Sequence, residues 1–225
     1  MRENLTQSIE DYLKAIYELT LKEGRASTTH LADYLDVTPA SVTGMIKKLS
    51  SSSPPLLEYE KHQGVELTED GRKIALKVVR SHRLLELFLT RFLNYPWEEV
   101  DAEADRLEHV ISETFEDRIA EVLGHPEYDP HGDPIPKKDL SLPDTSSVPL
   151  SALRPGQEAT ITRVRDTDSE LLKHLSEIGI TPNAEIRVEG YSEFDGNLHL
   201  QIKSTGKTEV LGPRITEQIY IALKS

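Results

Sequence analysis

Apolar residues in the first 50 positions recur at helical spacing and are separated by short breaks. Residues 6–23 place an apolar side chain every three to four positions, which predicts a helix that ends at Gly24. Two shorter helices are expected over 28–35 and 39–49, the second with Pro39 at its first position, where the missing N–H costs nothing. Two short helices joined by a tight turn are typical of a helix-turn-helix, but a helical hairpin with a solvated face has the same pattern.

The residues after these helices favour the helix-turn-helix. The stretch LLEYEKHQGVELT reads as two short strands around a polar tip, and a hairpin directly after a recognition helix is a wing. The preceding SSSSPP stretch at 50–55 is expected to form a flexible loop. The positions expected to contact DNA are caps and polar residues of the two helices and the wing tip: Thr28, Thr38, Pro39, Ala40, Ser41, Thr43, Lys47, Lys48, Lys61 and His62.

The middle of the chain is predicted to be helical. Apolar stripes run through residues 68–93, with Thr68 as the cap, and through residues 97–123, so one long helix is expected over each range. Two apolar helices that follow a small DNA-binding domain are suited to a dimer interface, because a palindromic operator is bound by two copies of the DNA-binding domain.

A proline-rich stretch separates these helices from a region of alternating residues. Residues 126–155 hold 7 of the 13 prolines, which predicts an extended, semi-rigid linker. Beyond it, EATITRV, EIRVEGY, NLHLQIK and EQIYIAL alternate apolar and polar residues as half-buried strands do, and one helix is expected over 169–178. The fold class is therefore mostly α with a small all-β C-terminal domain, a β-barrel.

The charge is concentrated in the middle of the chain. The net charge of −13 divides into −3 over residues 1–73, −7 over 74–143 and −3 over 144–225. A chain this acidic should bind DNA poorly until cations offset the repulsion. No apolar run approaches the roughly 18 residues of a membrane span, and the acidic, amphipathic start does not resemble a signal peptide, so no membrane contact and a cytoplasmic location are expected.

The middle helices also carry side chains with metal-ligand spacing. His82 and Glu86 are four residues apart, and Asp105, Glu108 and His109 share one helix face. Each motif alone is more often solvated surface, but the two occur on consecutive helices. Imidazole and carboxylate without cysteine suit Mn(II), Fe(II), Co(II), Ni(II) or Zn(II). The other histidines have no comparable carboxylate pattern and are expected to be surface or contact residues: His30, His62, His125, His131, His174 and His199.

Several of these stretches together resemble the diphtheria toxin repressor family of iron- and manganese-dependent regulators. The resemblance covers nearly the whole chain and rests on IEDYLKAIYEL, VTPASVTGMIKKL, GVELTEDGRKIA, SHRLLELFL, AEADRLEHVIS and HGDPIP. The C-terminal GITPNAEIRV and ITEQIYIAL are similar to the SH3-like barrel of ferrous-iron transport protein A. The resemblance implies a winged helix-turn-helix at 1–73, a helical metal-binding and dimerisation domain at 74–143, and an SH3-like domain at 144–225.

The resemblance also implies a set of metal ligands. It places ligands at Asp11 on the first helix, at His82, Glu86, Asp101 and Asp105, at the Glu108–His109 pair, and in the barrel domain, where Asp168 is the first candidate. Asp101 and Asp105 stand where iron-type members have histidine and cysteine. Lys14 stands where manganese-type members without a barrel have a second acidic ligand, which argues against a binuclear site of that kind.

The function implied is a metal-dependent transcriptional regulator, expected to be a repressor and not an enzyme. Loaded with Mn(II) or Fe(II), it would bind palindromic double-stranded operator DNA as a homodimer and control genes of metal homeostasis. Co(II), Ni(II) and Zn(II) fit the same donors in vitro. Three alternatives stay open: a winged-helix regulator of a non-metal ligand, a metalloenzyme, which the lack of a nucleophile motif or phosphate loop disfavours, and a barrel that binds proline-rich segments.

Overall fold

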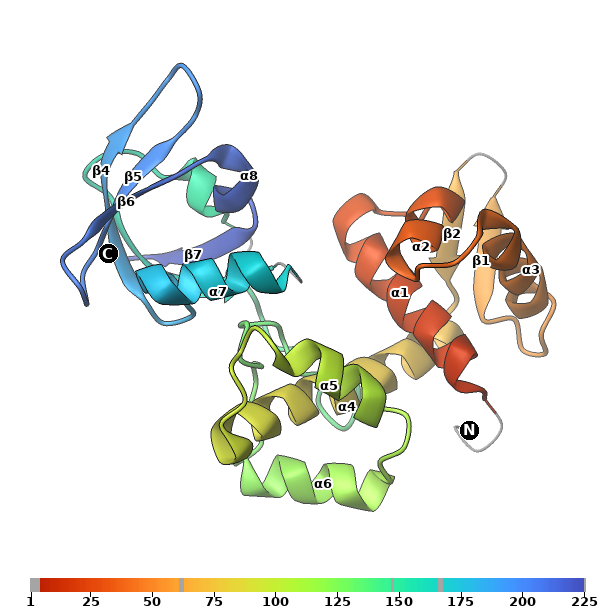
Figure 1. The fold of residues 1–225 in the computed structure, drawn as a ribbon. Coiled ribbons are helices and arrows are strands. Elements are labelled where there is room, and N and C mark those ends of the chain that lie inside the picture. The colour runs from red at the N-terminus through yellow and green to blue at the C-terminus, as the bar shows by residue number, and fades with distance from the viewer. Residues whose placement is uncertain (1–4, 61–62, 147, 166–167, 225) are drawn as a thin grey trace. The chain divides into compact units, whose positions relative to one another are not determined.

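The computed structural model describes residues 5–60, 63–146, 148–165 and 168–224 (Figure 1). The chain divides into two compact units. One holds the chain up to Ser81 together with residues 108–111 and 136–141, and the other holds the remaining residues. Helix α4 (Glu69–Leu93) begins in the first unit and continues into the second.

The first unit contains the predicted winged helix-turn-helix. Its elements are α1 (Gln7–Glu23), α2 (Thr28–Tyr34), α3 (Pro39–Ser50), β1 (Leu57–Glu60) and β2 (Gly64–Leu67). The two strands pair antiparallel as the expected wing. All three helices and both strands are therefore confirmed, with boundaries within a residue or two of the sequence prediction.

Local side-chain hydrogen bonds explain where α2 and α3 begin. The Ser27 hydroxyl accepts a hydrogen bond from the backbone N–H of His30 at 3.0 Å, and the Thr38 hydroxyl accepts one from Ser41 at 3.2 Å. Each bond satisfies a backbone donor that the first helical turn leaves unpaired. Helix α3 then buries the apolar side chains Val42, Ile46 and Leu49, which leaves its polar face exposed.

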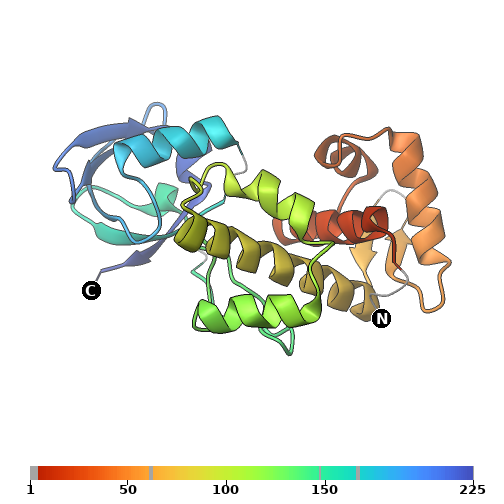
Figure 2. The same ribbon diagram turned by 60° about the horizontal axis from the view of Figure 1, so that its bottom comes forward.

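The middle of the chain contains three helices where two were predicted. Helix α4 (Glu69–Leu93) confirms the long helix over 68–93, but α5 (Val100–Leu107) and α6 (Glu113–Val122) replace the single helix expected over 97–123 (Figure 2). That prediction is wrong because Ser112 caps a new helix by accepting a hydrogen bond from Phe115 N–H at 3.2 Å. The apolar spacing continues across the break, so periodicity alone did not reveal it.

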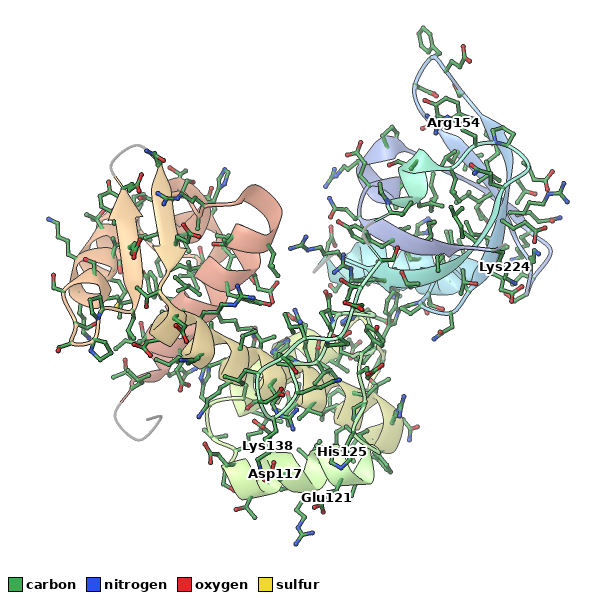
Figure 3. All side chains as sticks on the ribbon, turned by 180° about the vertical axis from the view of Figure 1, so that it is seen from behind. Asp117, Glu121, His125, Lys138, Arg154 and Lys224 are labelled. Atoms are coloured by element: carbon green, nitrogen blue, oxygen red, sulfur yellow. The ribbon has the colours of Figure 1, made fainter. Side chains whose placement is uncertain are left out.

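The C-terminal part is a five-stranded antiparallel sheet with the order β6-β5-β4-β3-β7. Its elements are η2 (Leu150–Ala152), β3 (Glu158–Val164), α7 (Ser169–Ile178), β4 (Glu185–Tyr191), β5 (Leu198–Ile202), β6 (Thr208–Leu211), α8 (Pro213–Thr216) and β7 (Ile219–Leu223). Alternate residues of the strands fill one core, which Leu172 and Leu175 of α7 complete. Arg154, labelled in Figure 3, lies in the same domain. Its guanidinium group stacks on the ring of Tyr191 at 4.1 Å from the ring centroid. The small all-β domain is confirmed, and β6 is a strand that the sequence analysis missed.

The proline-rich segment has little regular structure, but it is held by contacts along its length. Ile135 is buried, Arg83 donates a hydrogen bond to the carbonyl of Pro134 at 2.6 Å, and Arg80 donates one to the carbonyl of Pro136 at 2.7 Å. The segment is therefore packed rather than a free spacer. No helix in the described part of the chain is long and apolar enough to cross a membrane.

Gly132 in this segment lies directly against strand β3 of the barrel. Its φ is +86°, and a Cβ at this position would lie 2.0 Å from the carbonyl oxygen of Thr162. Next to it, Val164 N–H donates a hydrogen bond to the carbonyl of His131 at 2.9 Å. Only glycine permits both this backbone conformation and this close approach.

We expect Gly132→Ala to destabilise the second unit by about 3 kcal/mol, because it adds a steric clash to the strain of a positive φ. Gly156→Ala is the matched control, since Gly156 has φ +89° and no atom lies within 4 Å of the place that a Cβ would take. The free energy of unfolding of that control should fall by only about 1 kcal/mol. Denaturant unfolding followed by fluorescence of Trp97, the one tryptophan, measures both losses. Equal losses in the two variants would contradict the close approach.

Candidate metal centres

The first candidate centre joins helix α1 to the connection between α5 and α6, entirely within the first unit. The imidazole of His109 is at its middle. Its Nδ1 lies 2.7 Å from Glu10 Oε2, and its Nε2 lies 2.8 Å from Asp11 Oδ1 and 3.2 Å from Glu108 Oε1. We call these residues, together with Lys14, the first cluster.

The break between α5 and α6 shapes this cluster. Because a new helix begins after Ser112, Glu108 and His109 lie in a turn rather than in the middle of a helix. The two adjacent side chains can then approach the same face of α1. A continuous helix would point neighbouring residues about 100° apart around its axis.

Glu10 determines which nitrogen of His109 is available to a ligand. Its carboxylate is almost fully buried, at 5% exposure, and its hydrogen bond occupies Nδ1. We assign the proton to Nδ1 from this network, so Nε2 faces Asp11 and Glu108. A carboxylate behind a histidine is the usual arrangement that orients a metal-binding imidazole. The sequence analysis missed Glu10, because the family resemblance placed a ligand only at its neighbour Asp11.

The carboxylates also favour a protonated imidazole. Burial alone would lower the pKa of His109, but hydrogen bonds from the ring to Asp11, Glu10 and Glu108 outweigh it and raise the pKa to about 11. The metal-free cluster thus holds a proton where positive charge is needed.

Lys14 is the second positive group in the first cluster. Its Nζ lies 2.8 Å from Glu108 Oε2, and the side chains of Lys14 and Glu108 are only 13% and 2% exposed. This contact accounts for the second oxygen of Glu108, whose first oxygen faces His109.

The second candidate centre lies in the second unit around Glu86 of α4. Glu86 Oε1 lies 3.5 Å from His82 Nε2 and 3.4 Å from His131 Nδ1. Asp101 Oδ1 is 3.4 Å from His82 Nε2, and Asp129 supplies a further buried carboxylate. We call these five residues the second cluster.

The proline-rich segment supplies two members of the second cluster. The Asp129 carboxylate accepts hydrogen bonds from the backbone N–H groups of His131 at 2.8 Å and Asp133 at 2.9 Å, which fixes the turn. His131 Nε2 lies 2.8 Å from the carbonyl oxygen of Trp97, so its other ring nitrogen faces Glu86. The expectation that His131 is a surface or contact residue is therefore wrong, because the turn brings it into the interior.

Electrostatics in the second cluster indicate a shortage of positive charge. Burial and the nearby carboxylates of Glu86 and Asp133 raise the pKa of Asp129, although Arg83 lies 3.6 Å away. Burial opposes ionisation of Glu86, yet His82 and His131 hold its pKa well below the usual range. The pKa of His131 is raised to about 9, because the hydrogen bond to Glu86 and its charge outweigh burial.

The remaining predicted ligands are placed differently. Asp105 is half-exposed, with its Oδ1 3.3 Å from His82 Nδ1. Asp168 caps α7 by accepting hydrogen bonds from the backbone N–H groups of Glu170 and Leu171, and it lies outside the ligand groups found among the described residues. Their roles as ligands stay predictions.

The predicted DNA contacts lie mainly on one exposed face. Helix α3 and its cap expose Thr38, Pro39, Ala40, Ser41, Thr43, Lys47 and Lys48, while Thr28 on α2 is half-buried. Lys61 and His62 lie outside the described residues. The other described histidines are exposed, as expected: His30, His125 (Figure 3), His174 and His199.

The donor atoms of both clusters fit a divalent transition metal. In each ligand group, such as Asp11, Glu108 and His109, the atoms lie within 4.8 Å of one another. Ligands on opposite sides of an octahedral ion with bonds of ~2.1 Å are about 4.2 Å apart, so a small contraction suffices. Carboxylate and imidazole donors without thiolate suit Mn(II) and Fe(II).

Comparison with known families agrees with this architecture. Residues 4–65 match the iron dependent repressor N-terminal DNA binding domain, and residues 68–137 match its metal binding and dimerisation domain. Residues 148–223 match the FeoA domain.

Individual relatives extend the match over most of the chain. The iron-dependent repressor IdeR of Mycobacterium tuberculosis (strain H37Rv) is 34% identical over 197 residues, covering 82% of this chain and 85% of that protein. The chain belongs to the diphtheria toxin repressor family. MntR of Bacillus subtilis (strain 168) is 38% identical over 135 residues, covering 60% of this chain and 90% of that protein. A solved manganese-dependent transcriptional repressor in complex with manganese superposes with a TM-score of 0.86 at 38% identity, covering 96% of this chain and 100% of that one.

Membership makes this chain a metal-dependent transcriptional repressor of the iron- and manganese-dependent kind, and not an enzyme. Its domains include one for DNA binding and one for dimerisation, which imply operator DNA and a second copy of the chain as partners.

We expect Glu10→Gln to weaken Mn(II) binding at the first cluster by about 10- to 100-fold, because the imidazole loses the carboxylate that orients it. The measurement is calorimetry in a chain that also carries Glu86→Gln and His131→Gln, which we call the single-cluster variant. Glu121→Gln, at an exposed position on α6, is the control and should not change the affinity. An unchanged affinity in Glu10→Gln would contradict the orienting role.

Metal affinity of the first cluster should rise with pH. His109 is protonated below its raised pKa of about 11 and must lose that proton before Nε2 can bind a metal. Between about pH 6 and 8, each ion bound should release about one proton, and the affinity should increase about tenfold per pH unit. Titration of the single-cluster variant in buffers of different ionisation enthalpy counts the protons. Absence of proton release would show that His109 is already neutral.

Proposed function

We propose that the first cluster is the site at which Mn(II) or Fe(II) activates this repressor for binding to palindromic operator DNA. The observation that carries the proposal is the geometry around His109, where the carboxylates of Asp11 and Glu108 converge on Nε2. These donors come from two segments that are far apart in the sequence. One ion bound there would connect α1 to the connection between α5 and α6.

In this mechanism the residues of the protein hold the metal ion and orient its ligands. Asp11, Glu108 and His109 would hold the ion, and Glu10 keeps Nε2 turned toward it. A divalent cation supplies the positive charge that the carboxylates lack, with a fixed coordination geometry. Since α1 packs with α2 and the wing strand β2, its restraint would extend to the elements that contact DNA. Metal binding and DNA binding would then strengthen each other by linkage.

The exposed face of α3 provides the DNA contacts in this proposal. Ala40, Ser41 and Thr43 would reach base edges in the major groove, while Lys47 and Lys48 would contact phosphates. Dimerisation through residues 74–143 would present two such faces to the two halves of an operator. Residues 1–73 and 144–225 would act as the DNA-binding and SH3-like domains.

Mn(II) is favoured over Fe(II) as the native metal. The chain has no cysteine, and aspartates occupy the positions at which the resemblance expects softer or nitrogen donors. Hard oxygen ligands suit Mn(II). A similar solved structure is described as a manganese-dependent repressor in complex with manganese. We propose that the second cluster is a further site for the same ion.

Replacement of Glu108 and His109 together by alanine should abolish Mn(II)-dependent DNA binding without unfolding the protein. The matched control is the Glu121→Ala, His125→Ala pair, which removes the same side-chain types from exposed positions at α6 (Figure 3). Capture of fragmented genomic DNA with Mn(II), with Fe(II) and with chelator measures the effect. The control should recover discrete palindromic sites only with metal.

Two outcomes would contradict the proposal. An unchanged metal response in the double variant would exclude the first cluster as the activating site. Equal DNA recovery by the unmodified protein with metal and with chelator would favour a regulator that responds to a non-metal ligand.

A further inference from the structure

Lys14 places a positive charge inside the first cluster. It follows Asp11 by three residues, so both side chains lie on the same face of α1. Its ammonium group contacts Glu108 Oε2 at 2.8 Å, and the Glu108 side chain is only 2% exposed. The other oxygen of Glu108 faces His109 Nε2 at 3.2 Å. The two oxygens of one buried carboxylate therefore face different positive groups.

The charges of the first cluster balance with one divalent ion. Glu10, Asp11 and Glu108 carry three negative charges, and Lys14 carries one positive charge. With His109 neutral, the remaining charge of about −2 equals that of a single divalent cation with opposite sign. A second divalent ion would leave an excess of positive charge in a poorly solvated place, which is costly.

We propose that Lys14 takes the place of a second cation in the first cluster. It occupies Glu108 Oε2, restricts the cluster to one divalent ion and lowers the affinity for that ion. This inference deepens the proposed function, because it assumes that the first cluster binds metal.

The geometry supports both parts of the proposal. With Oε2 bound to Lys14, Glu108 offers only Oε1 to a metal, and a second ion would have to displace the ammonium group. Lys14 is 13% exposed, so water screens its repulsion of the metal poorly. Lys73 provides a contrast, since it pairs with Glu69 at 2.6 Å but both side chains are more than half exposed. Its charge should be well screened and should not affect the metal.

The test measures how many Mn(II) ions the single-cluster variant and its derivatives bind, and with what affinity. Electron paramagnetic resonance of free aqueous Mn(II) gives the number of ions bound and their affinity. The single-cluster variant should bind one ion. When Lys14→Gln is added to the single-cluster variant, the protein should still bind one ion, but at least about tenfold more tightly. The glutamine can still donate a hydrogen bond to Glu108. When Lys14→Glu is added instead, the protein should bind two ions and give a spin-coupled spectrum. When Lys73→Gln is added, the number of ions and their affinity should be the same as in the single-cluster variant.

Thermal unfolding is a second measurement, and its result differs between a purely structural role for Lys14 and an effect of Lys14 on metal binding. Without metal, Lys14→Gln should lower the Tm, because buried Glu108 loses its positive partner. Saturating Mn(II) should then raise the Tm of Lys14→Gln by more than that of the single-cluster variant. If Lys14 only supported the fold, Mn(II) would raise both by the same amount.

The outcomes separate this inference from the proposed function. Unchanged affinity in Lys14→Gln, a single ion in Lys14→Glu, or two ions with Lys14 present would overturn the role of Lys14 and leave the metal site intact. No Mn(II) bound by the single-cluster variant or by Lys14→Gln would instead overturn the first cluster as a metal site, and the inference with it.

Discussion

Buried negative charge without enough positive charge is the constraint on which the functional part of this structure depends. Glu10 and Glu108 in the first cluster, and Glu86 and Asp129 in the second, are carboxylates largely withdrawn from water. Burying an unpaired charge is expensive, so such groups need protons, basic side chains or metal ions. In the metal-free protein, protonated histidines, Lys14 and Arg83 partly meet this need. In the proposed function, a divalent cation would replace the protons, and this exchange would be the chemical basis of metal sensing.

The same constraint explains the location of the negative charge in the sequence. The excess lies in residues 74–143, which contain most of the candidate ligands, rather than in the helix-turn-helix. Helix α3 keeps Lys47 and Lys48 on its exposed face. In the proposed function, most of the charge that attracts metal and the charge that attracts DNA would lie in different segments, and an ion bound at Asp11 on α1 would connect the two.

Periodicity predicted most of the secondary structure, because helices and strands that bury one face show it directly in the sequence. It failed at Ser112, where apolar spacing continues through the break and only a cap signals the new helix. It also failed at β6, an edge strand in which only Leu211 is buried, so that its burial does not alternate as it does in a half-buried strand. His131 was missed because it lies on an irregular turn, where no period relates a residue to its neighbours in space. The position of Lys14 was noticed, but its contact with Glu108 depends on tertiary structure.

The peptide unit that joins His131 to Gly132 serves two purposes. The His131 ring belongs to the second cluster, while its carbonyl pairs with β3 and Gly132 lies against Thr162. In the proposed function, selection on barrel packing and selection on metal binding would therefore act on the same backbone atoms. Over evolution, the residues around Thr162 and the HGD turn should change together, and a barrel exchanged between relatives without its matching turn should fit poorly.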